Sequence, residues 1–247
     1  MTQRLFLQNR LGPGESLACP AAQNNYLRNV LRLSKGADIL LFNGIDGEWR
    51  AVIEKIDRKA CILLPREQTR PQDEPADLHY LFAPLKKARL DYMVQKATEM
   101  GASRLRPVLT RFTMARRVKA ERMRANAIEA AEQCNLLNLP QIDALQGFDE
   151  MMDGWDKTRA LVFCDETAPS ADPTQPLKSL RGRPLAVIIG PEGGFSADER
   201  ERLRSAPFVT SISLGPRILR ADTAAVAALA LVQAMAGDWS SHQDKTI

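Results

Sequence analysis

The stretch from Leu185 to Ala236 constrains the fold more than any other part of the chain. It repeats one order of features: a short apolar run, an irregular loop with glycine, and a helix pattern. The first run, 185–189, is continuous and β-branched, as expected for a parallel strand buried on both faces. The second run is 209–214, and glycine loops after such strands are where open α/β sheets bind ligands. The sequence therefore predicts an α/β domain with a small-molecule site at two loops, and tight turns without a ligand are the alternative.

The first loop, Gly-Pro-Glu-Gly-Gly at 190–194, leaves the backbone almost free of side chains where it turns. It is not a P-loop, because no Gly-Lys-Ser/Thr follows, and the Rossmann G-x-G-x-x-G spacing is absent. A nucleotide phosphate is therefore not the expected ligand.

The two helix patterns that follow the loops differ in character. Ser196 and Glu199 have the spacing of a capping box that opens a polar helix. The second helix, expected from about Asp222 to Ala236, is alanine-rich and almost uncharged, so it should be buried on all sides. The charged residues Arg220 and Asp222 lie beside this very apolar helix. Their presence favours a ligand-binding site over tight turns without a ligand.

Composition excludes several classes of protein. The net charge is +4, and residues 84–124 hold 12 Lys and Arg against 3 Asp and Glu, which predicts a phosphate-backbone partner or a solvated basic helix face. No apolar run reaches membrane-spanning length and the N-terminus lacks a signal peptide, so we expect a cytoplasmic protein with no membrane partner. Two histidines and four scattered cysteines argue against a metal site and against disulfides.

Two domains are expected. Residues 1–70 contain several short strands with glycine turns, typical of a compact barrel, and a helix pattern over 24–33. Residues 71–77 are polar and proline-containing, which indicates a linker. Strand and helix patterns alternate from residue 78 onward, as in an α/β domain.

Ile189–Gly194 together with Leu214–Arg220 resembles the paired motifs of the SPOUT-class RNA methyltransferases. More narrowly, the chain resembles, over most of its length, the bacterial ribosomal RNA small subunit methyltransferase E family, which methylates uridine N3 in 16S ribosomal RNA. The resemblance implies a SPOUT-type knotted parallel-sheet α/β methyltransferase domain over 78–247 and a PUA-like RNA-binding β-barrel over 1–70. It also implies S-adenosyl-L-methionine as cofactor, 16S rRNA or the small ribosomal subunit as partner, and a homodimer.

The resemblance and the residue chemistry together give candidate site residues. Arg220 is expected to stabilise negative charge on the uracil, and Asp222 is the nearest candidate base, with orientation of Arg220 or capping of the last helix as alternatives. RNA contacts are expected from Arg28, Arg32, Lys86 and Lys87, unless these are ordinary exposed residues. The cofactor-binding candidates are Gly190, Pro191, Glu192, Gly193, Gly194, Leu214, Gly215, Leu219 and Thr223.

Two other functions stay open. A SPOUT ribose 2′-O-methyltransferase should carry an early Asn-x-Gly-x-x-x-Arg motif, which the sequence lacks. A non-catalytic RNA-binding ribosome-assembly factor needs only the basic patches, and it leaves the three-glycine loop and the alanine-rich helix unexplained.

Overall fold

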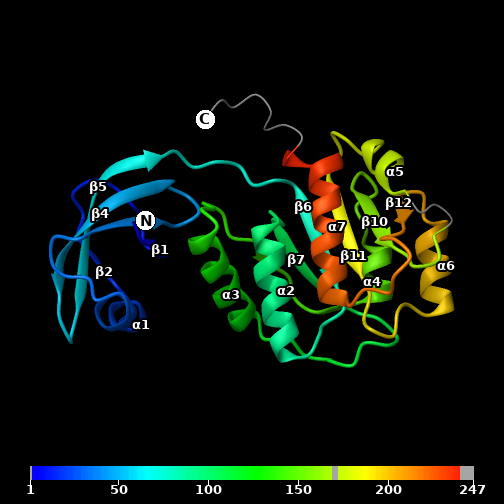
Figure 1. Ribbon diagram of the computed structural model, residues 1–247, viewed down its shortest axis with the longest axis horizontal. Helices are drawn as coiled ribbons and strands as arrows, with labels where there is room; N and C mark the ends of the chain where they lie inside the picture. Colours follow the sequence, from blue (N-terminus) through cyan, green and yellow to red (C-terminus); the bar gives the residue numbers. More distant parts are fainter. Residues whose placement is uncertain (1, 169–171, 240–247) are drawn as a thin grey trace. The chain divides into compact units, whose positions relative to one another are not determined.

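The computed structural model describes residues 2–168 and 172–239. The chain forms two compact units (Figure 1). The first comprises Met1–Glu74 and Ala131–Leu139, and the second comprises Pro75–Ala130 and Pro140–Ile247. The domain limits expected from the sequence, 1–70 and 78–247, put residues 131–139 in the second domain. In the structure these residues belong to the first unit.

The first unit is built on a curled, mixed five-stranded sheet. Its strands are β1 (Arg4–Phe6), β2 (Leu17–Ala18), β3 (Asp38–Phe42), β4 (Glu48–Ile56) and β5 (Cys61–Arg70). They are ordered β1-β3-β4-β5-β2; β1 runs parallel to β3, and the other pairs are antiparallel. Three register shifts between the long strands β4 and β5 bend the sheet. Alternate residues such as Ile39, Leu41 and Ile53 therefore point to one enclosed apolar core.

The helix of this unit differs from the prediction of 24–33. It begins one residue after Pro20 as α1 (Ala21–Asn25) and continues as the π-helix η1 (Tyr26–Val30). The Leu31 N–H donates to the Tyr26 carbonyl at 3.0 Å, an i→i−5 bond. Arg32 has φ +53°, a left-handed conformation that no helix continues. The predicted end of the helix at residue 33 was therefore wrong. The helical spacing of apolar residues continues to Leu33, but the backbone leaves the helix after Val30.

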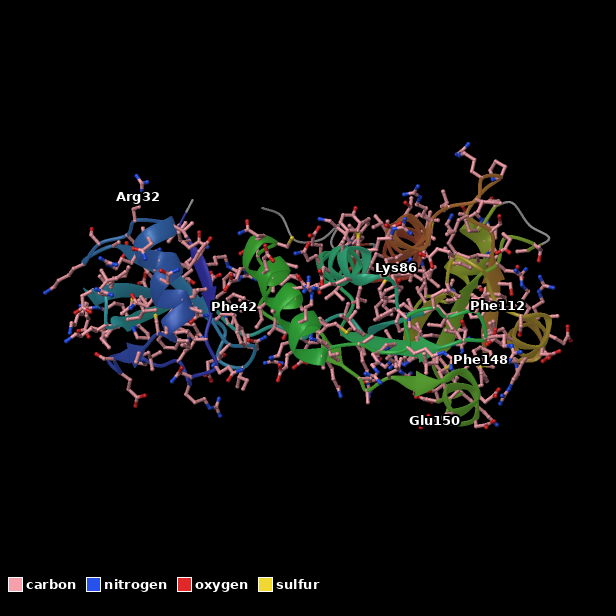
Figure 2. All side chains as sticks on the ribbon, turned by 90° about the horizontal axis from the view of Figure 1, so that it is seen from below. Arg32, Phe42, Lys86, Phe112, Phe148 and Glu150 are labelled. Carbon is pink, nitrogen blue, oxygen red and sulfur yellow. The ribbon has the colours of Figure 1, made fainter. Side chains whose placement is uncertain are left out.

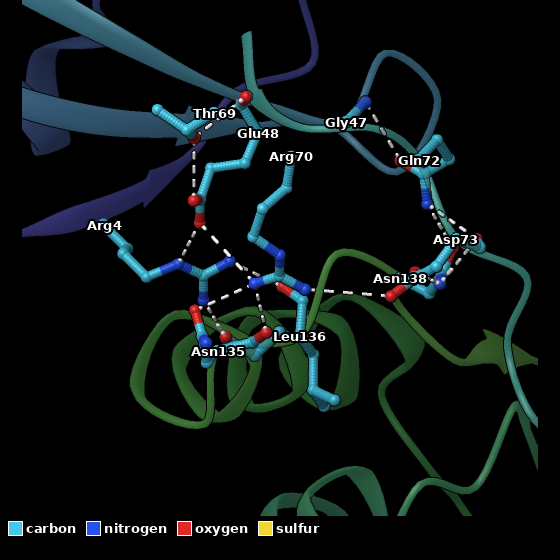
Figure 3. Close-up of polar contacts among 11 residues, drawn as sticks. Arg4, Gly47, Glu48, Thr69, Arg70, Gln72, Asp73, Asn135, Leu136 and Asn138 are labelled. Atoms are coloured by element: carbon cyan, nitrogen blue, oxygen red, sulfur yellow. Dashed lines mark hydrogen bonds and ion pairs between the residues drawn. The ribbon is translucent and has the colours of Figure 1, made fainter. Parts of the chain in front are cut away.

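A buried arginine holds residues 131–139 in the first unit (Figure 3). Arg4 Nε donates to Glu48 Oε2 at 2.8 Å. Its Nη1 donates to the Ala131 carbonyl at 2.7 Å and its Nη2 to the Leu136 carbonyl at 2.9 Å. These carbonyls lie at and beyond the end of α3 (Ala120–Gln133), where helix carbonyls lack partners within the helix. Arg4 thus satisfies the end of this helix from a strand far away in the sequence.

The second unit is built on a parallel sheet, which confirms the expected α/β class. Its strands are β6 (Leu78–Phe82), β7 (Arg104–Leu109), β8 (Gln141–Ile142), β9 (Gln146–Gly147), β10 (Ala160–Cys164), β11 (Leu185–Ile189) and β12 (Val209–Ile212). They follow the order β12-β10-β11-β6-β7-β8, with β9 also beside β7. All pairs are parallel, so the loops after β10, β11 and β12 emerge at one edge.

Helices cover both faces of this sheet. Besides α3, they are α2 (Lys87–Glu99), α4 (Phe148–Asp153), α5 (Thr174–Lys178), α6 (Ala197–Ser205) and α7 (Ala221–Met235). Helices α2, α5 and α7 contribute to one apolar core, and α4 and α6 to the core on the other face. The predicted capping box at the start of α6 is confirmed, since the Glu199 N–H donates to Ser196 Oγ at 3.2 Å.

The expectation that the alanine-rich helix is buried all round was wrong for α7. Ala225, Ala228 and Val232 face the sheet and are buried. Val226 and Ala230 are only half-buried. Helix α7 lies in the outer helix layer, so no other described part of the chain covers its outward face (Figure 1).

Candidate active site

A cavity of about 280 Å³ lies at the carboxyl edge of the parallel sheet. Three loops form it: the one after β10, the one after β11, and the one after β12, with the first turn of α7. Strand order explains the convergence, because β10 lies between β11 and β12 and all three run parallel. Its lining residues are Cys164, Asp165, Glu166, Ile189, Gly190, Pro191, Glu192, Gly193, Gly194, Phe195, Leu214, Gly215, Arg217, Ile218, Leu219, Ala221 and Ala224.

Eight of the nine predicted cofactor-binding residues are therefore brought together by the fold, and Thr223 is not among the lining residues. Thr223 is exposed on the first turn of α7. Further lining residues were not predicted from the sequence, among them Asp165, Glu166, Phe195 and Ile218. A usable signal for the first two was the buried apolar run that ends in Asp-Glu, since it had to end at the same sheet edge as the glycine loops.

Gly190 has no room for a side chain. A Cβ built on it would lie 2.6 Å from Cε2 of Phe195, which is far inside van der Waals contact. Phe195 cannot easily move, because it is buried and packs edge-on against Phe163 at a centroid distance of 5.2 Å. The ring therefore sits directly against the backbone of the first loop, which keeps that part of the cavity wall bare.

Gly194 and Gly215 are required for a different reason. Their φ values are +71° and +97°, in the left-handed region that glycine adopts at little cost. The Gly194 N–H donates to the Pro191 carbonyl at 2.8 Å and closes a tight turn. Both loops thus contain, at the cavity, a backbone conformation that residues with a side chain rarely adopt.

The predicted catalytic pair lies at the start of α7, next to the lining residues Leu219 and Ala221. Arg220 is the N-cap residue and its side chain is exposed. Asp222 is not the N-cap residue, but its Oδ1 accepts from the Thr223 N–H at 2.9 Å in the first turn of α7, so the helix-capping alternative stays open. No hydrogen bond or ion pair joins Asp222 to Arg220 among the residues that the structure describes. Arg220 is thus exposed beside two lining residues, whereas Asp222 is half-buried and accepts one backbone hydrogen bond.

A buried carboxylate, Asp165, anchors the loop after β10. Burial alone raises the pKa of Asp165, but hydrogen bonds from Thr167 and Arg204 outweigh it, and the pKa is lowered. Arg204 Nε donates to Asp165 Oδ2 at 2.8 Å, and Thr167 Oγ1 to Oδ1 at 2.9 Å. The neighbouring thiol is no nucleophile at neutral pH, because burial raises the pKa of Cys164 to about 12.

The residues present fit S-adenosyl-L-methionine. Bare backbone at the glycines can approach the adenine edge closely, and apolar side chains such as Ile189 and Leu214 can pack on its ring. The lining also carries carboxylates, which can meet the cationic ammonium group: Glu166 is paired with Arg200, and Glu192 is paired with Arg89 at 2.9 Å.

The predicted RNA-binding residues lie at the surface of both units. Arg28 and Arg32 are exposed around the end of η1 in the first unit. Lys86 and Lys87 are exposed at the start of α2 in the second (Figure 2). Over the described residues, no group of three or more His, Cys, Asp or Glu is arranged to hold a metal ion. Within that same part of the chain, no helix is both long and apolar enough to cross a membrane.

Comparison with known proteins agrees with this geometry. Residues 72–233 match the RNA methyltransferase domain family, and residues 21–65 match the PUA domain of RNA methyltransferases. Among solved structures, the ribosomal RNA small subunit methyltransferase E of Neisseria gonorrhoeae, bound to S-adenosyl methionine, is 25% identical with a TM-score of 0.83. The match covers 97% of this chain and 100% of that one. A methyltransferase of Legionella pneumophila, in complex with the same cofactor, is 27% identical with a TM-score of 0.84, over 96% and 99% of the two chains.

Sequence relatives carry the same family name. The ribosomal RNA small subunit methyltransferase E of Rickettsia conorii is 31% identical over 232 residues, which cover 93% of this chain and 94% of the relative. The Bacillus subtilis protein of that name is 28% identical over 251 residues, covering 93% and 95%. With these matches and the cavity at the expected loops, the chain belongs to the ribosomal RNA small subunit methyltransferase E family.

Proposed function

We propose that this protein transfers a methyl group from S-adenosyl-L-methionine to N3 of a uridine in 16S ribosomal RNA. The observation that carries the proposal is the cavity at the sheet edge, whose walls are the two side-chain-poor loops. Family membership and the cofactor bound in the Neisseria and Legionella structures support it.

In this proposal the loop backbones hold the cofactor, which supplies an electrophilic methyl group. The residues that would bind it are the eight predicted ones that line the cavity, and Thr223, in the first turn of α7, is a ninth candidate. We also propose the trefoil knot for residues 78–247, on resemblance, and the PUA-like domain of residues 1–70 as an RNA-binding module beyond the linker 71–77.

Arg220 and Asp222 would act on the RNA base. Uridine N3 is a weak acid and must lose its proton before or during methyl transfer. The exposed guanidinium of Arg220, beside the cavity, would stabilise negative charge on the uracil, and the Asp222 carboxylate would accept the proton. Both roles need positioning rather than a metal.

The partner proposals follow the surface chemistry. Exposed Arg28, Arg32, Lys86 and Lys87 would contact phosphates of 16S rRNA or of the small subunit, in the cytoplasm. A homodimer would cover the half-buried stripe of α7 that includes Val226 and Ala230.

The test is transfer of labelled methyl groups to small ribosomal subunits, or to 16S rRNA, from a strain that lacks the gene. Mass spectrometry of the digested nucleosides should find 3-methyluridine. A ribose 2′-O-methyl product would indicate the alternative transferase, and RNA binding without transfer or cofactor binding would indicate an assembly factor.

Arg220 is tested separately. We expect Arg220→Ala to lower kcat by at least about 100-fold, in the range of a lost charge-stabilising group. The affinity for S-adenosyl-L-methionine, measured by calorimetry, should not change because the side chain is outside the cavity lining. Full transfer by this variant would remove Arg220 from the mechanism.

A further inference from the structure

An aromatic side chain is exposed next to the cofactor cavity although it does not line it. Phe112 lies in the loop after β7 (Figure 2). Its exposed fraction is 47%. A Cβ built on Gly193, a lining residue, would lie 3.2 Å from Cβ of Phe112. The phenylalanine is thus in contact with the first glycine loop, and its ring is open to solvent at the rim of the site.

The turn that carries Phe112 is held rigidly. The Thr110 N–H donates to Thr113 Oγ1 at 2.9 Å, the Thr113 N–H donates back to the Thr110 carbonyl at 3.1 Å, and both threonines are buried. The Arg111 N–H donates to Glu199 Oε1 at 2.8 Å. Glu199 also closes the capping box of α6, so the turn is tied to the helix that follows the glycine loop. A ring presented in this way loses little conformational entropy when a flat ligand packs on it.

Three arginines lie close to Phe112 in the sequence. Arg111, Arg116 and Arg117 are exposed, and no ion pair among the described residues involves them. Proteins bind single-stranded RNA with exposed aromatic side chains and nearby arginines, since bases stack on the rings and arginines meet the phosphates.

We propose that Phe112 is the stacking platform for a nucleobase of the RNA substrate, held at the rim of the cofactor cavity through its contact with Gly193. The inference rests on the proposed function, and it names a positioning residue that none of the motifs indicated. Stacking here would fix the RNA strand beside the cavity, so that the target base enters with little freedom left.

The experiment compares Phe112→Leu with Phe112→Trp in the full-length protein. Leucine keeps an apolar side chain on Gly193 but loses the flat ring, whereas tryptophan keeps a stacking surface. We expect Phe112→Leu to raise KM for 16S rRNA about tenfold, in the range measured for loss of one stacked base, with kcat reduced far less. Phe112→Trp should stay close to the parent protein.

A matched control is Tyr92→Leu on α2. Tyr92 is 45% exposed and has Lys96 near its ring, so the change in exposed aromatic surface is comparable. It should leave KM for RNA unchanged. Calorimetry with S-adenosyl-L-methionine and thermal unfolding, done on every variant, separate a structural role of Phe112 from an RNA contact.

Direct RNA binding makes the test independent of turnover. The parent protein has three tryptophans, so its fluorescence change on adding the 16S rRNA transcript is the reference. The transcript should quench the fluorescence of Phe112→Trp more than that of the parent. Unchanged RNA affinity of Phe112→Leu would overturn the inference, as would a loss of cofactor affinity with RNA affinity intact. Failure of the parent to methylate any RNA would instead contradict the proposed function.

Discussion

Replacing Arg4 by methionine isolates the contact that holds residues 131–139 in the first unit. The side chain is buried against Glu48, which is buried as well, and its guanidinium lies 4.5 Å above the Phe42 ring. Arg4→Met keeps the apolar stem but removes the charge and all the hydrogen bonds that the guanidinium donates. Glu48 is then left as a buried carboxylate without its main partner.

The expected loss of unfolding free energy depends on the contacts that Glu48 keeps in the variant. Breaking a buried ion pair by removal of one partner costs about 3–5 kcal/mol. Glu48 Oε1 still accepts from Thr69 Oγ1 at 2.9 Å, and Arg70 Nη1 stays 3.9 Å from Oε2. These contacts place the expected loss near the lower end, about 3 kcal/mol of unfolding free energy. Removal of both charges in Arg4→Met with Glu48→Met should recover part of it, because paired apolar replacements of buried ion pairs are often neutral.

Urea unfolding followed by far-UV circular dichroism measures this difference. The control is Arg50→Met, since Arg50 and Glu67 are 3.2 Å apart on the same sheet but more than half exposed. Surface pairs contribute at most about 1 kcal/mol, so this variant should be close to the parent. A loss for Arg4→Met no larger than for Arg50→Met would refute the reasoning.

Gly190→Ala should destabilise the protein by about 1–3 kcal/mol and weaken S-adenosyl-L-methionine binding in calorimetry, because the Cβ meets Phe195 at 2.6 Å. In Gly215→Ala the new Cβ has space, but the alanine must adopt φ +97°, so the loss of unfolding free energy should be near about 1 kcal/mol. Equal losses for the two variants would contradict the steric argument. Burial lowers the pKa of His79 from 6.5 to about 4. The unfolded chain then takes up a proton below pH 6.5 that the folded protein does not, so stability should fall towards pH 4 by at most about 1.4 kcal/mol per pH unit. In urea titrations across this range, His79→Gln should flatten the slope, and an unchanged slope would exclude His79 as its source.

Short-range rules determined much of this protein from its sequence. The capping box of Ser196 and Glu199 and the glycine loop depend on residues within one turn of each other, so local spacing was enough to predict them. The parallel α/β class followed from alternating strand and helix patterns. A parallel sheet also requires the loop after β10 to share an edge with the glycine loops, and the strand order agrees with this.

Contacts between distant segments were decided by the tertiary structure. Nothing local to Arg4 indicates that its partners lie 127 residues away at the end of α3. Nothing local to Phe112 indicates that it rests on Gly193. The periodicity over 24–33 did not reveal the reversal at Arg32, and the composition of α7 did not reveal its half-buried face. Periodicity and capping record only which residues favour burial or a turn, whereas strand order and helix placement determine which distant groups meet.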